Sequence, residues 1–165
     1  MVDISLLWEV LSMFGDIQYW LGLTMGILIV YLAVGKNSKK KVAWIIFALL
    51  PAVILTSQVT YFLKLWFQTP RPCEGQIDCP NSYSFPSAHA AVMFAFATVA
   101  VLNVKDVKYK IASVGLAFLV SISRVALNVH TPLDIFIGSI VGIACGLLVQ
   151  EAYKTIDHLR ISQQA

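Results

Sequence analysis

Charged residues are scarce in this chain of 165 residues, at 13%, whereas hydrophobic residues make up 58% and the mean hydropathy is +0.76. A soluble globular domain typically carries about twice that share of charge. The composition therefore excludes an ordinary soluble protein and indicates that a lipid bilayer is the solvent. The length of the chain predicts a single domain over residues 1–165.

Cysteine and histidine are also scarce, with three residues of each. They form no cluster with the spacing of a metal site, so we expect neither a metal nor another cofactor. Cys73 and Cys79 flank a short polar loop, and a disulfide between them requires an oxidising compartment. The sequence leaves the bridged and the reduced state open. Cys145 lies in an apolar run and is interpreted as a packing residue.

The first sixteen residues lack the basic segment and the small-residue cleavage site of a signal peptide. Leu7, Val10, Leu11 and Phe14 recur at helical spacing instead. This pattern predicts an N-terminal helix over residues 1–16 that lies in the membrane interface or forms a short sixth segment. A membrane-surface anchor is the better interpretation of this helix, and a gate for substrate is the alternative.

Five uncharged runs predict an all-α, polytopic membrane bundle of about five transmembrane helices. Two of the runs are long enough to cross about 30 Å of hydrocarbon as helices. The other three span only if a few polar residues at one end are included. In chain order, the runs lie at 17–35, 42–63, 90–104, 111–123 and 135–150.

The basic residues predict the orientation of these helices, because short cytoplasmic loops collect positive charge. Lysines fill the connections at 36–41 and 105–110, and Lys154 and Arg160 follow the last run. If five spans cross the membrane in alternating directions, all of these basic residues fall on the same side of it. We therefore expect both connections and the C-terminus to be cytoplasmic in a multi-pass protein of the cell membrane. The loop at 69–85 then lies on the outer side, and its length is typical of a functional loop.

Two helices are predicted to begin at that outer side. Ser87 is a natural N-cap for the third run. Thr131, with Asp134 three residues later, has the pattern of a capping box for the fifth run. Glycine then recurs every four residues along the fifth run, which favours close helix packing in lipid. These glycines are Gly138, Gly142 and Gly146.

Ionisable residues gather at the predicted outer ends of the spans, where an unpaired charge is costly. Lys64 and Arg71 are seven residues apart, which places them two turns apart on one helical face if the helix continues nearly that far. Three cations that the orientation rule does not explain, together with two helix N-termini, suit a phosphate group. His130 has the chemistry of a nucleophile that Asp134 orients, and His89 that of a proton donor. The predicted site comprises Lys64, Arg71, Ser87, His89, Arg124, His130 and Asp134.

Each of these residues has a structural explanation when it is taken alone. Lys64 and Arg71 fit the pattern of interfacial side chains whose charged ends reach water. Ser87 fits a helix cap, Asp134 fits half of a capping box, and either histidine fits an interfacial or core position. These explanations are independent of one another, and they do not account for the gathering at one membrane level. The site interpretation is therefore favoured.

Three motifs between residues 64 and 134 resemble the active-site pattern of the type 2 phosphatidic acid phosphatases, which share it with vanadium haloperoxidases. In that family the motifs are a lysine followed after six residues by Arg-Pro, then Pro-Ser-Gly-His, then Ser-Arg followed by a spaced histidine and aspartate. They occur here in order and with intact spacing. They are Lys64 to Arg71-Pro72, Pro86-Ser87-Ala88-His89, and Ser123-Arg124 through His130 to Asp134.

The resemblance implies a membrane enzyme that hydrolyses a lipid phosphomonoester or an isoprenoid (undecaprenyl-type) diphosphate through a phosphohistidine intermediate, without a metal. It implies that His130 attacks phosphorus, Asp134 orients it and His89 is the general acid. Ala88 departs from the family's glycine, keeping the backbone amide but adding a methyl group that narrows the approach of phosphate. The implied phosphate-binding residues are Lys64, Arg71, Ser87, Ala88 and Arg124.

The substrate is not determined by the sequence. The small chain has no additional domain for a large head group, which slightly favours an isoprenoid carrier diphosphate over phosphatidylglycerophosphate, phosphatidate or a phosphorylated glycolipid. A vanadate-dependent peroxidase is disfavoured by membrane burial. A non-catalytic anion binder or transporter would need the cations but not His130 with Asp134. The expected partners are the lipid substrate and the bilayer, with no nucleic acid, and no pattern indicates an oligomeric state.

Overall fold

All regular structure in the described part of the chain is helical, which confirms the predicted all-α class. The computed structural model describes residues 7, 8, 10, 13, 15, 43–77 and 79–162. The predicted run at 17–35 and the lysines at 36–41 lie outside the described residues, and the predicted helix at 1–16 is described at only five positions. The elements are a π-helical segment η1 (Ile45–Leu49), α4 (Leu50–Phe67), α5 (Ala88–Asn103), α6 (Val107–Ala126) and α7 (Pro132–Ser162).

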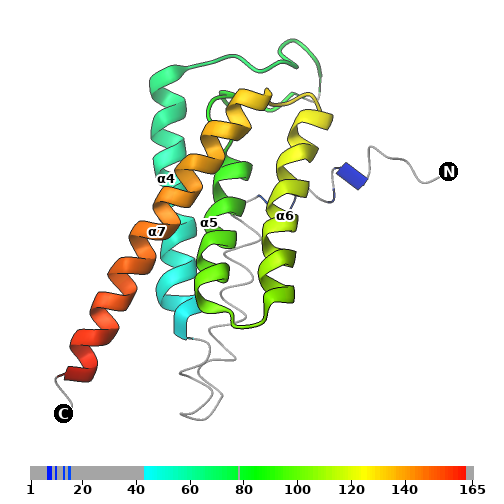
Figure 1. Cartoon of the computed structure of the whole chain (residues 1–165). Coiled ribbons are helices and arrows are strands. Elements are labelled where there is room, and N and C mark those ends of the chain that lie inside the picture. Colours follow the sequence, from blue (N-terminus) through cyan, green and yellow to red (C-terminus); the bar gives the residue numbers. More distant parts are fainter. Residues whose placement is uncertain are drawn as a thin grey trace.

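Helix α5 lies at the centre of the bundle and packs against α4, α6 and α7 (Figure 1). Its buried face is built largely from alanine, whose small side chain lets neighbouring helices approach closely. Helix α7 crosses the bundle obliquely and extends beyond the other helices toward the C-terminus (Figure 1). The buried alanines of α5 are Ala90, Ala91, Ala95, Ala97 and Ala100.

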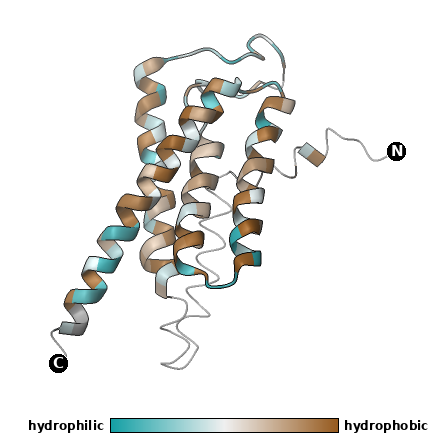
Figure 2. Cartoon of the chain, viewed as in Figure 1, coloured by the Kyte–Doolittle hydropathy of each residue, from teal (hydrophilic) through white to brown (hydrophobic). Residues whose placement is uncertain are grey.

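Three helical stretches in the described residues are long and apolar enough to cross a membrane: Ile45–Phe67, Val107–Ala126 and Pro132–Leu159. The remaining apolar helix, Ala88–Asn103, is shorter, as the sequence predicted. Apolar residues dominate the bundle along its length, whereas hydrophilic residues gather in the connections and in the C-terminal part of α7 (Figure 2). Large apolar side chains such as Phe62, Phe118 and Phe136 are exposed on the surface. Such a surface suits lipid and indicates an integral membrane protein.

Helix α4 ends earlier than a shared helical face for Lys64 and Arg71 would require. It stops at Phe67, and Gln68 follows in the left-handed region at φ 47°. Pro70 and Pro72 come next, and proline neither donates a backbone hydrogen bond nor fits a helix interior. Arg71 therefore reaches the end of the bundle from the loop, and the expectation of two helical turns between the two cations is wrong.

Helix α7 is longer than the apolar run that predicted it. The helix continues to Ser162, although the run ends at residue 150. Its exposed C-terminal turns carry an ion pair between Lys154 Nζ and Glu151 Oε1 at 2.8 Å. Loss of the apolar pattern marks the point where the helix leaves the bundle, not the point where it ends.

The recurring glycines of α7 bring its backbone against that of α5. A Cβ atom at Gly142 would lie 2.0 Å from the carbonyl oxygen of Ala91, and one at Gly138 would lie 2.5 Å from that of Ser87. Only glycine allows this approach. The contact confirms the packing interpretation and sets the N-termini of α5 and α7 side by side, where Ser87 N donates to the carbonyl oxygen of Asp134 at 3.0 Å.

A polar pair joins the same two helices near the opposite end of α5. Asn103 Nδ2 donates to Gln150 Oε1 at 2.7 Å, and Gln150 Nε2 donates back to Asn103 Oδ1 at 3.3 Å. Gln150 is 2% exposed. A buried amide without a partner costs free energy in an apolar environment, so the pair also fixes the axial register of α5 against α7.

Replacing Gln150 with Leu should lower stability by about 1 kcal/mol or more, because the Asn103 side chain then loses its side-chain partner. Thermal unfolding in detergent measures the loss. The double variant Asn103→Leu/Gln150→Leu should recover part of it, since both polar groups are then removed. A Gln150→Leu protein as stable as the parent would contradict this role.

Candidate active site

The predicted site residues come together at the end of the bundle where α5 and α7 begin and α4 and α6 end (Figure 1). We call this the loop end, because the loop at 68–87 and the turn at 127–131 close it. Lys64 lies in the last turn of α4, and Arg124 in that of α6. Arg71 comes from the loop, Ser87, Ala88 and His89 from the start of α5, His130 from the turn and Asp134 from the first turn of α7.

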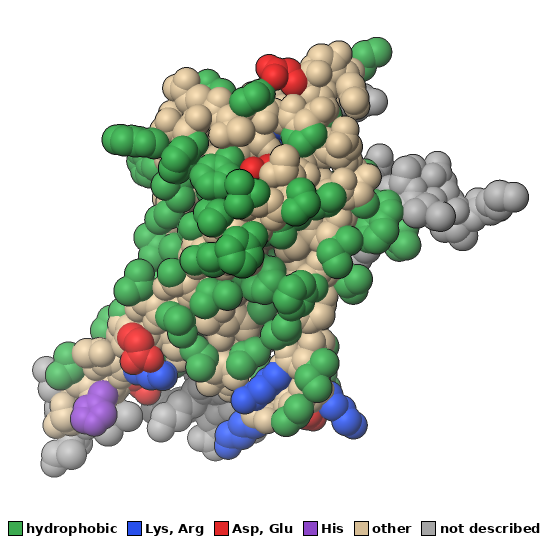
Figure 3. Space-filling model, turned by 45° about the horizontal axis from the view of Figure 1, so that its top comes forward, with side chains coloured by type: hydrophobic (Ala, Val, Ile, Leu, Met, Phe, Trp, Pro, Cys, Tyr) green, Lys and Arg blue, Asp and Glu red, His purple; other side chains and the backbone are tan. Residues whose placement is uncertain are grey.

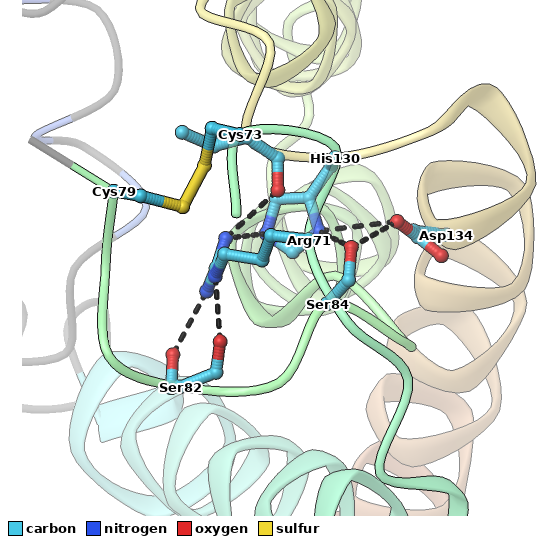
Figure 4. The surroundings of a disulfide bond; sticks show 8 residues. Arg71, Cys73, Cys79, Ser82, Ser84, His130 and Asp134 are labelled. Carbon is cyan, nitrogen blue, oxygen red and sulfur yellow. Dashed lines mark hydrogen bonds and ion pairs between the residues drawn. A yellow bond between two sulfur atoms is a disulfide. The ribbon is translucent and has the colours of Figure 1, made fainter. Parts of the chain in front are cut away.

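Arg71 joins the loop to the turn (Figure 4). Its Nε donates to the carbonyl oxygen of Ser82 at 2.6 Å and its Nη2 to Ser82 Oγ at 2.8 Å. On the other side, Nη1 donates to the carbonyl oxygen of Val129 at 2.9 Å and lies 3.2 Å from His130 Nε2. Burial lowers the pKa of Arg71 from its ordinary value, yet a guanidinium keeps its charge in proteins. A permanent cation therefore faces Nε2 of His130.

His130 is 3% exposed, and its contacts define which ring nitrogen carries the proton. Because Arg71 Nη1 can only donate, Nε2 accepts and the proton belongs on Nδ1. Nδ1 lies 3.3 Å from Ser84 Oγ and 3.4 Å from Asp134 Oδ2. Burial, followed by the positive charges of Arg71, Lys64 and Arg124, lowers the pKa of His130 to about 2. The imidazole is thus neutral, with its lone pair on Nε2.

Asp134 combines the two roles that the sequence offered as alternatives. Thr131 N donates to Asp134 Oδ2 at 2.8 Å, and Asp134 N donates to Thr131 Oγ1 at 3.2 Å, which is a capping box. The same Oδ2 accepts from Ser84 Oγ at 2.5 Å and faces His130 Nδ1. The carboxylate therefore caps α7 and holds the histidine at once, and it is 2% exposed.

The Lys64 side chain anchors the loop at 68–87. Its Nζ donates to the carbonyl oxygens of Tyr83 and Ser84, the latter at 2.9 Å. These carbonyls are neutral acceptors, so the positive charge of Lys64 is solvated by the backbone without being neutralised by them. The lysine thus adds to the positive charge of the loop end.

The start of α5 and the end of α6 complete the site. Ser87 is fully buried and caps α5, accepting from Ala90 N at 3.4 Å, as the sequence predicted. Ala88 and His89 form the first turn, half-buried. Arg124 is buried, and its carbonyl oxygen accepts from Val129 N and His130 N at 3.2 Å each, which ties the turn to α6.

Gly15 lies against His89. It is buried, and a Cβ atom at this position would lie 2.4 Å from His89 Cδ2. The backbone of Gly15 therefore lies directly against the His89 ring, and any side chain at residue 15 would displace that ring. This contact brings a part of the chain that sequence analysis treated as a surface anchor into the wall of the site.

Ser82 and Ser84 are site residues that the sequence analysis missed. Both hydroxyls contact predicted residues, Ser82 contacting Arg71 and Ser84 contacting Asp134 and His130. Neither belongs to the three motifs by spacing. The available signal was their position just before Pro86, in a loop that the length alone marked as functional.

Comparison with known proteins identifies the family of this chain. The sequence model of the PAP2 superfamily matches residues 41–156, which is more than two thirds of the chain. The chain belongs to the PAP2 superfamily. Family membership confirms the resemblance to type 2 phosphatidic acid phosphatases. No curated protein sequence matches this PAP2 protein significantly.

Two solved structures resemble this PAP2 protein. LpxE of Aquifex aeolicus is 28% identical, with a TM-score of 0.68, over 90% of this chain and 86% of LpxE. A transmembrane PAP2-type phosphatidylglycerolphosphate phosphatase from Bacillus subtilis is 23% identical, with a TM-score of 0.77, over 94% of this chain and 79% of that protein. At 23% identity the second likeness supports the fold alone.

Cys73 and Cys79 form a disulfide, the state that the sequence left open. The bridge closes the loop between Arg71 and Ser82 (Figure 4). Cys145 is free and buried in α7. Among the described residues no group of three or more His, Cys, Asp or Glu side chains has the arrangement of a metal site.

Removing the disulfide should lower the stability of the loop end. The double variant Cys73→Ser/Cys79→Ser is expected to lose about 2 kcal/mol, since closing even a short loop restricts the unfolded chain. Thermal unfolding in detergent measures the loss, and Cys145→Ser is the matched control because it removes a thiol without a bridge. Equal losses in both proteins would refute a stabilising disulfide.

Acid should destabilise the protein through His130. Its pKa is about 2 in the folded protein and near 6.5 in the unfolded chain, so between these values only the unfolded chain binds the proton. Stability therefore falls as the pH drops below about 6.5, by at most about 1.4 kcal/mol per pH unit. His130→Asn, which cannot titrate, should lose less between pH 7.5 and 5.5 in thermal unfolding. An equal loss in both proteins would show that other groups govern the acid response.

Proposed function

We propose that this PAP2 protein is an integral membrane phosphatase that hydrolyses a lipid phosphomonoester or diphosphate through a phosphohistidine at His130. One observation carries the proposal: the neutral His130 presents Nε2 to Arg71 while Asp134 and Ser84 occupy Nδ1. An imidazole held in this way is a nucleophile directed at whatever anion the arginine binds. An anion binder without chemistry would not need this orientation.

The phosphoryl group is proposed to bind among Arg71, Lys64 and Arg124. Arg71 and Lys64 now donate to backbone carbonyls and to serine, and phosphate oxygens are stronger acceptors for the same donors. The N-terminus of α5 adds backbone amides at Ala88 and His89. These donors would stabilise the charge of the transition state, and the reaction is proposed to proceed without a metal ion.

The proposed reaction has two steps at one nitrogen. His130 Nε2 attacks phosphorus, the new N–P bond forms, and the bond from phosphorus to the leaving oxygen breaks while His89 gives that oxygen a proton. The imidazole keeps its Nδ1 proton and becomes positively charged, which the carboxylate of Asp134 stabilises. Water then gives a proton to His89 and attacks phosphorus, releasing inorganic phosphate and the neutral histidine.

The distribution of side chains supports a lipid substrate and an outward-facing site. Apolar side chains cover the middle of the face shown in Figure 3, and lysine and arginine side chains gather at the end away from the loop end. Lys105, Lys108 and Lys110 belong to that end, which the charge rule assigns to the cytoplasm. Exposed Trp66 lies near the end of α4, where aromatic residues favour the membrane interface. Phosphate of a lipid head group lies at this level.

An apolar hollow beside the site suits the chain of such a lipid. It has a volume of about 360 Å³ and lies between α5, α6 and α7. It begins next to the site, because Val125 follows Arg124 and Ile135 follows Asp134. We propose that an acyl or isoprenoid chain lies here, with an isoprenoid diphosphate slightly favoured over phosphatidylglycerophosphate or phosphatidate. Its large apolar lining residues are Phe94, Phe118, Ile122, Val125, Ile135 and Phe136.

Purified protein in detergent with EDTA should release phosphate from one lipid of a panel far faster than from a soluble phosphate ester. The panel holds a polyprenyl diphosphate, phosphatidylglycerophosphate, phosphatidate and a phosphorylated glycolipid. His130→Ala should lower turnover by about a thousandfold or more, since the nucleophile is lost, while inorganic phosphate still binds. His158→Ala, at an exposed position far along α7, should retain full activity.

Two outcomes would contradict the proposal. If the His130→Ala protein turned over lipid phosphate as fast as the unaltered protein, the phosphohistidine mechanism would be excluded. Phosphate binding without release from any lipid, in protein that unfolds cooperatively, would favour a non-catalytic anion binder. Loss of activity in EDTA, restored by a divalent cation, would instead remove only the claim of metal independence.

A further inference from the structure

Ser84 is held in the loop at both of its backbone groups. Its N donates to the carbonyl oxygen of Thr69 at 2.8 Å, and its carbonyl oxygen accepts from Lys64 Nζ at 2.9 Å. The residue is fully buried. These bonds determine where the side chain can point, and Figure 4 shows it directed toward His130 and Asp134.

The Ser84 hydroxyl lies between the carboxylate and the imidazole. Ser84 Oγ donates to Asp134 Oδ2 at 2.5 Å and lies 3.3 Å from His130 Nδ1. The carboxylate can only accept, so the hydroxyl proton belongs to that bond. The lone pairs of Oγ then remain to accept the proton of Nδ1. The three residues can therefore form a chain of hydrogen bonds in which Nδ1 of His130 donates to Ser84 Oγ and Ser84 Oγ donates to Asp134 Oδ2.

The direct contact between His130 and Asp134 is long for a hydrogen bond. Nδ1 and Oδ2 are 3.4 Å apart, beyond the usual 2.7–3.2 Å of an N–H···O bond. Oδ2 is also shared with Thr131 N, which donates at 2.8 Å. The serine hydroxyl, 3.3 Å from Nδ1, is a second long contact, and it is polarised by the same carboxylate, so the Nδ1 proton faces two acceptors at similar distance.

We propose that Ser84 is a positioning residue for the phosphatase reaction, whose hydroxyl shares the Nδ1 proton of His130 with Asp134 and keeps Nε2 free to attack phosphorus. This inference rests on the proposed function, because its consequence is a rate of phosphoryl transfer. A purely structural serine, present only to satisfy the buried carboxylate, would affect stability and leave the rate of chemistry unchanged.

Ser84→Ala should lower kcat for the preferred lipid by about 10- to 100-fold, the effect of losing one charge-assisted hydrogen bond. The KM should change by less than about threefold, since the main-chain carbonyl that binds Lys64 remains. Rapid-quench trapping should show the same loss in the rate of phosphohistidine formation. Ser84→Thr, which keeps the hydroxyl, should recover most of the rate.

The matched control is Ser113→Ala. Ser113 is a buried serine at the end of α6 away from the loop end, and its hydroxyl donates to Lys110 O within its own helix at 2.8 Å, so its loss should leave kcat unchanged. If Ser84→Ala does not fold, Ser84→Cys replaces it, because a thiol of similar shape is a much weaker donor. A kcat equal to that of Ser113→Ala would overturn the inference.

A double-variant cycle with Asp134→Asn tests whether Ser84 acts through the carboxylate. If it does, adding Ser84→Ala to Asp134→Asn should reduce kcat by less than about twofold further, because residues that act as a unit are not additive. Independent, multiplicative losses would overturn the inference. If the unaltered protein releases no phosphate, the proposed function itself is refuted. If the unaltered protein is active and the Ser84→Ala protein is equally active, only the role of Ser84 is refuted.

Discussion

The close contact of α7 with α5 is the constraint on which the site depends. Because glycines replace side chains along α7, the backbones touch at Ala91 and Ser87, and the first turns of both helices lie together. Asp134 and Ser87 are then joined through the backbone at 3.0 Å. In lipid, burial of apolar surface does not favour one helix contact over another. Close packing of the two backbones therefore determines which helix faces associate. The position of Asp134, and of His130 beside it, relative to the α5 N-terminus follows from it.

The loop end holds its charged side chains mainly with neutral partners. Lys64 and Arg71 donate to backbone carbonyls, and Asp134 accepts from Ser84 and from Thr131 N. Every one of these bonds also fixes a loop or a helix end. Because the partners of the two cations are mostly neutral, their positive charge remains in the site, and it adds to burial in lowering the pKa of His130 and keeping the imidazole neutral. The polar groups that order the loop thus also set the protonation state of the histidine.

Several parts of this arrangement were predictable because they depend on local chemistry. The caps at Ser87 and Thr131 follow from residue type and spacing, and the α7 glycines follow from a period of four. The position of Arg71 was predicted for the wrong reason, since left-handed Gln68 ends α4 and the loop carries the arginine instead. Ser84 was missed because a single serine before a motif shows no periodicity. The residues that its hydroxyl contacts, His130 and Asp134, are 46 and 50 positions away in the sequence.

The amino-acid sequence by itself determined the helical membrane class and the cations and histidines of the site, because hydropathy, caps and motif spacing act within a few turns of chain. Only the tertiary structure decided which nitrogen of His130 keeps its lone pair, that Asp134 both caps α7 and contacts His130, and that Gly15 lies against His89. These features depend on where distant backbones meet. Side-chain identity sets which hydrogen bonds are available, but the packing of α7 on α5 and the folding of the loop decide which of them form.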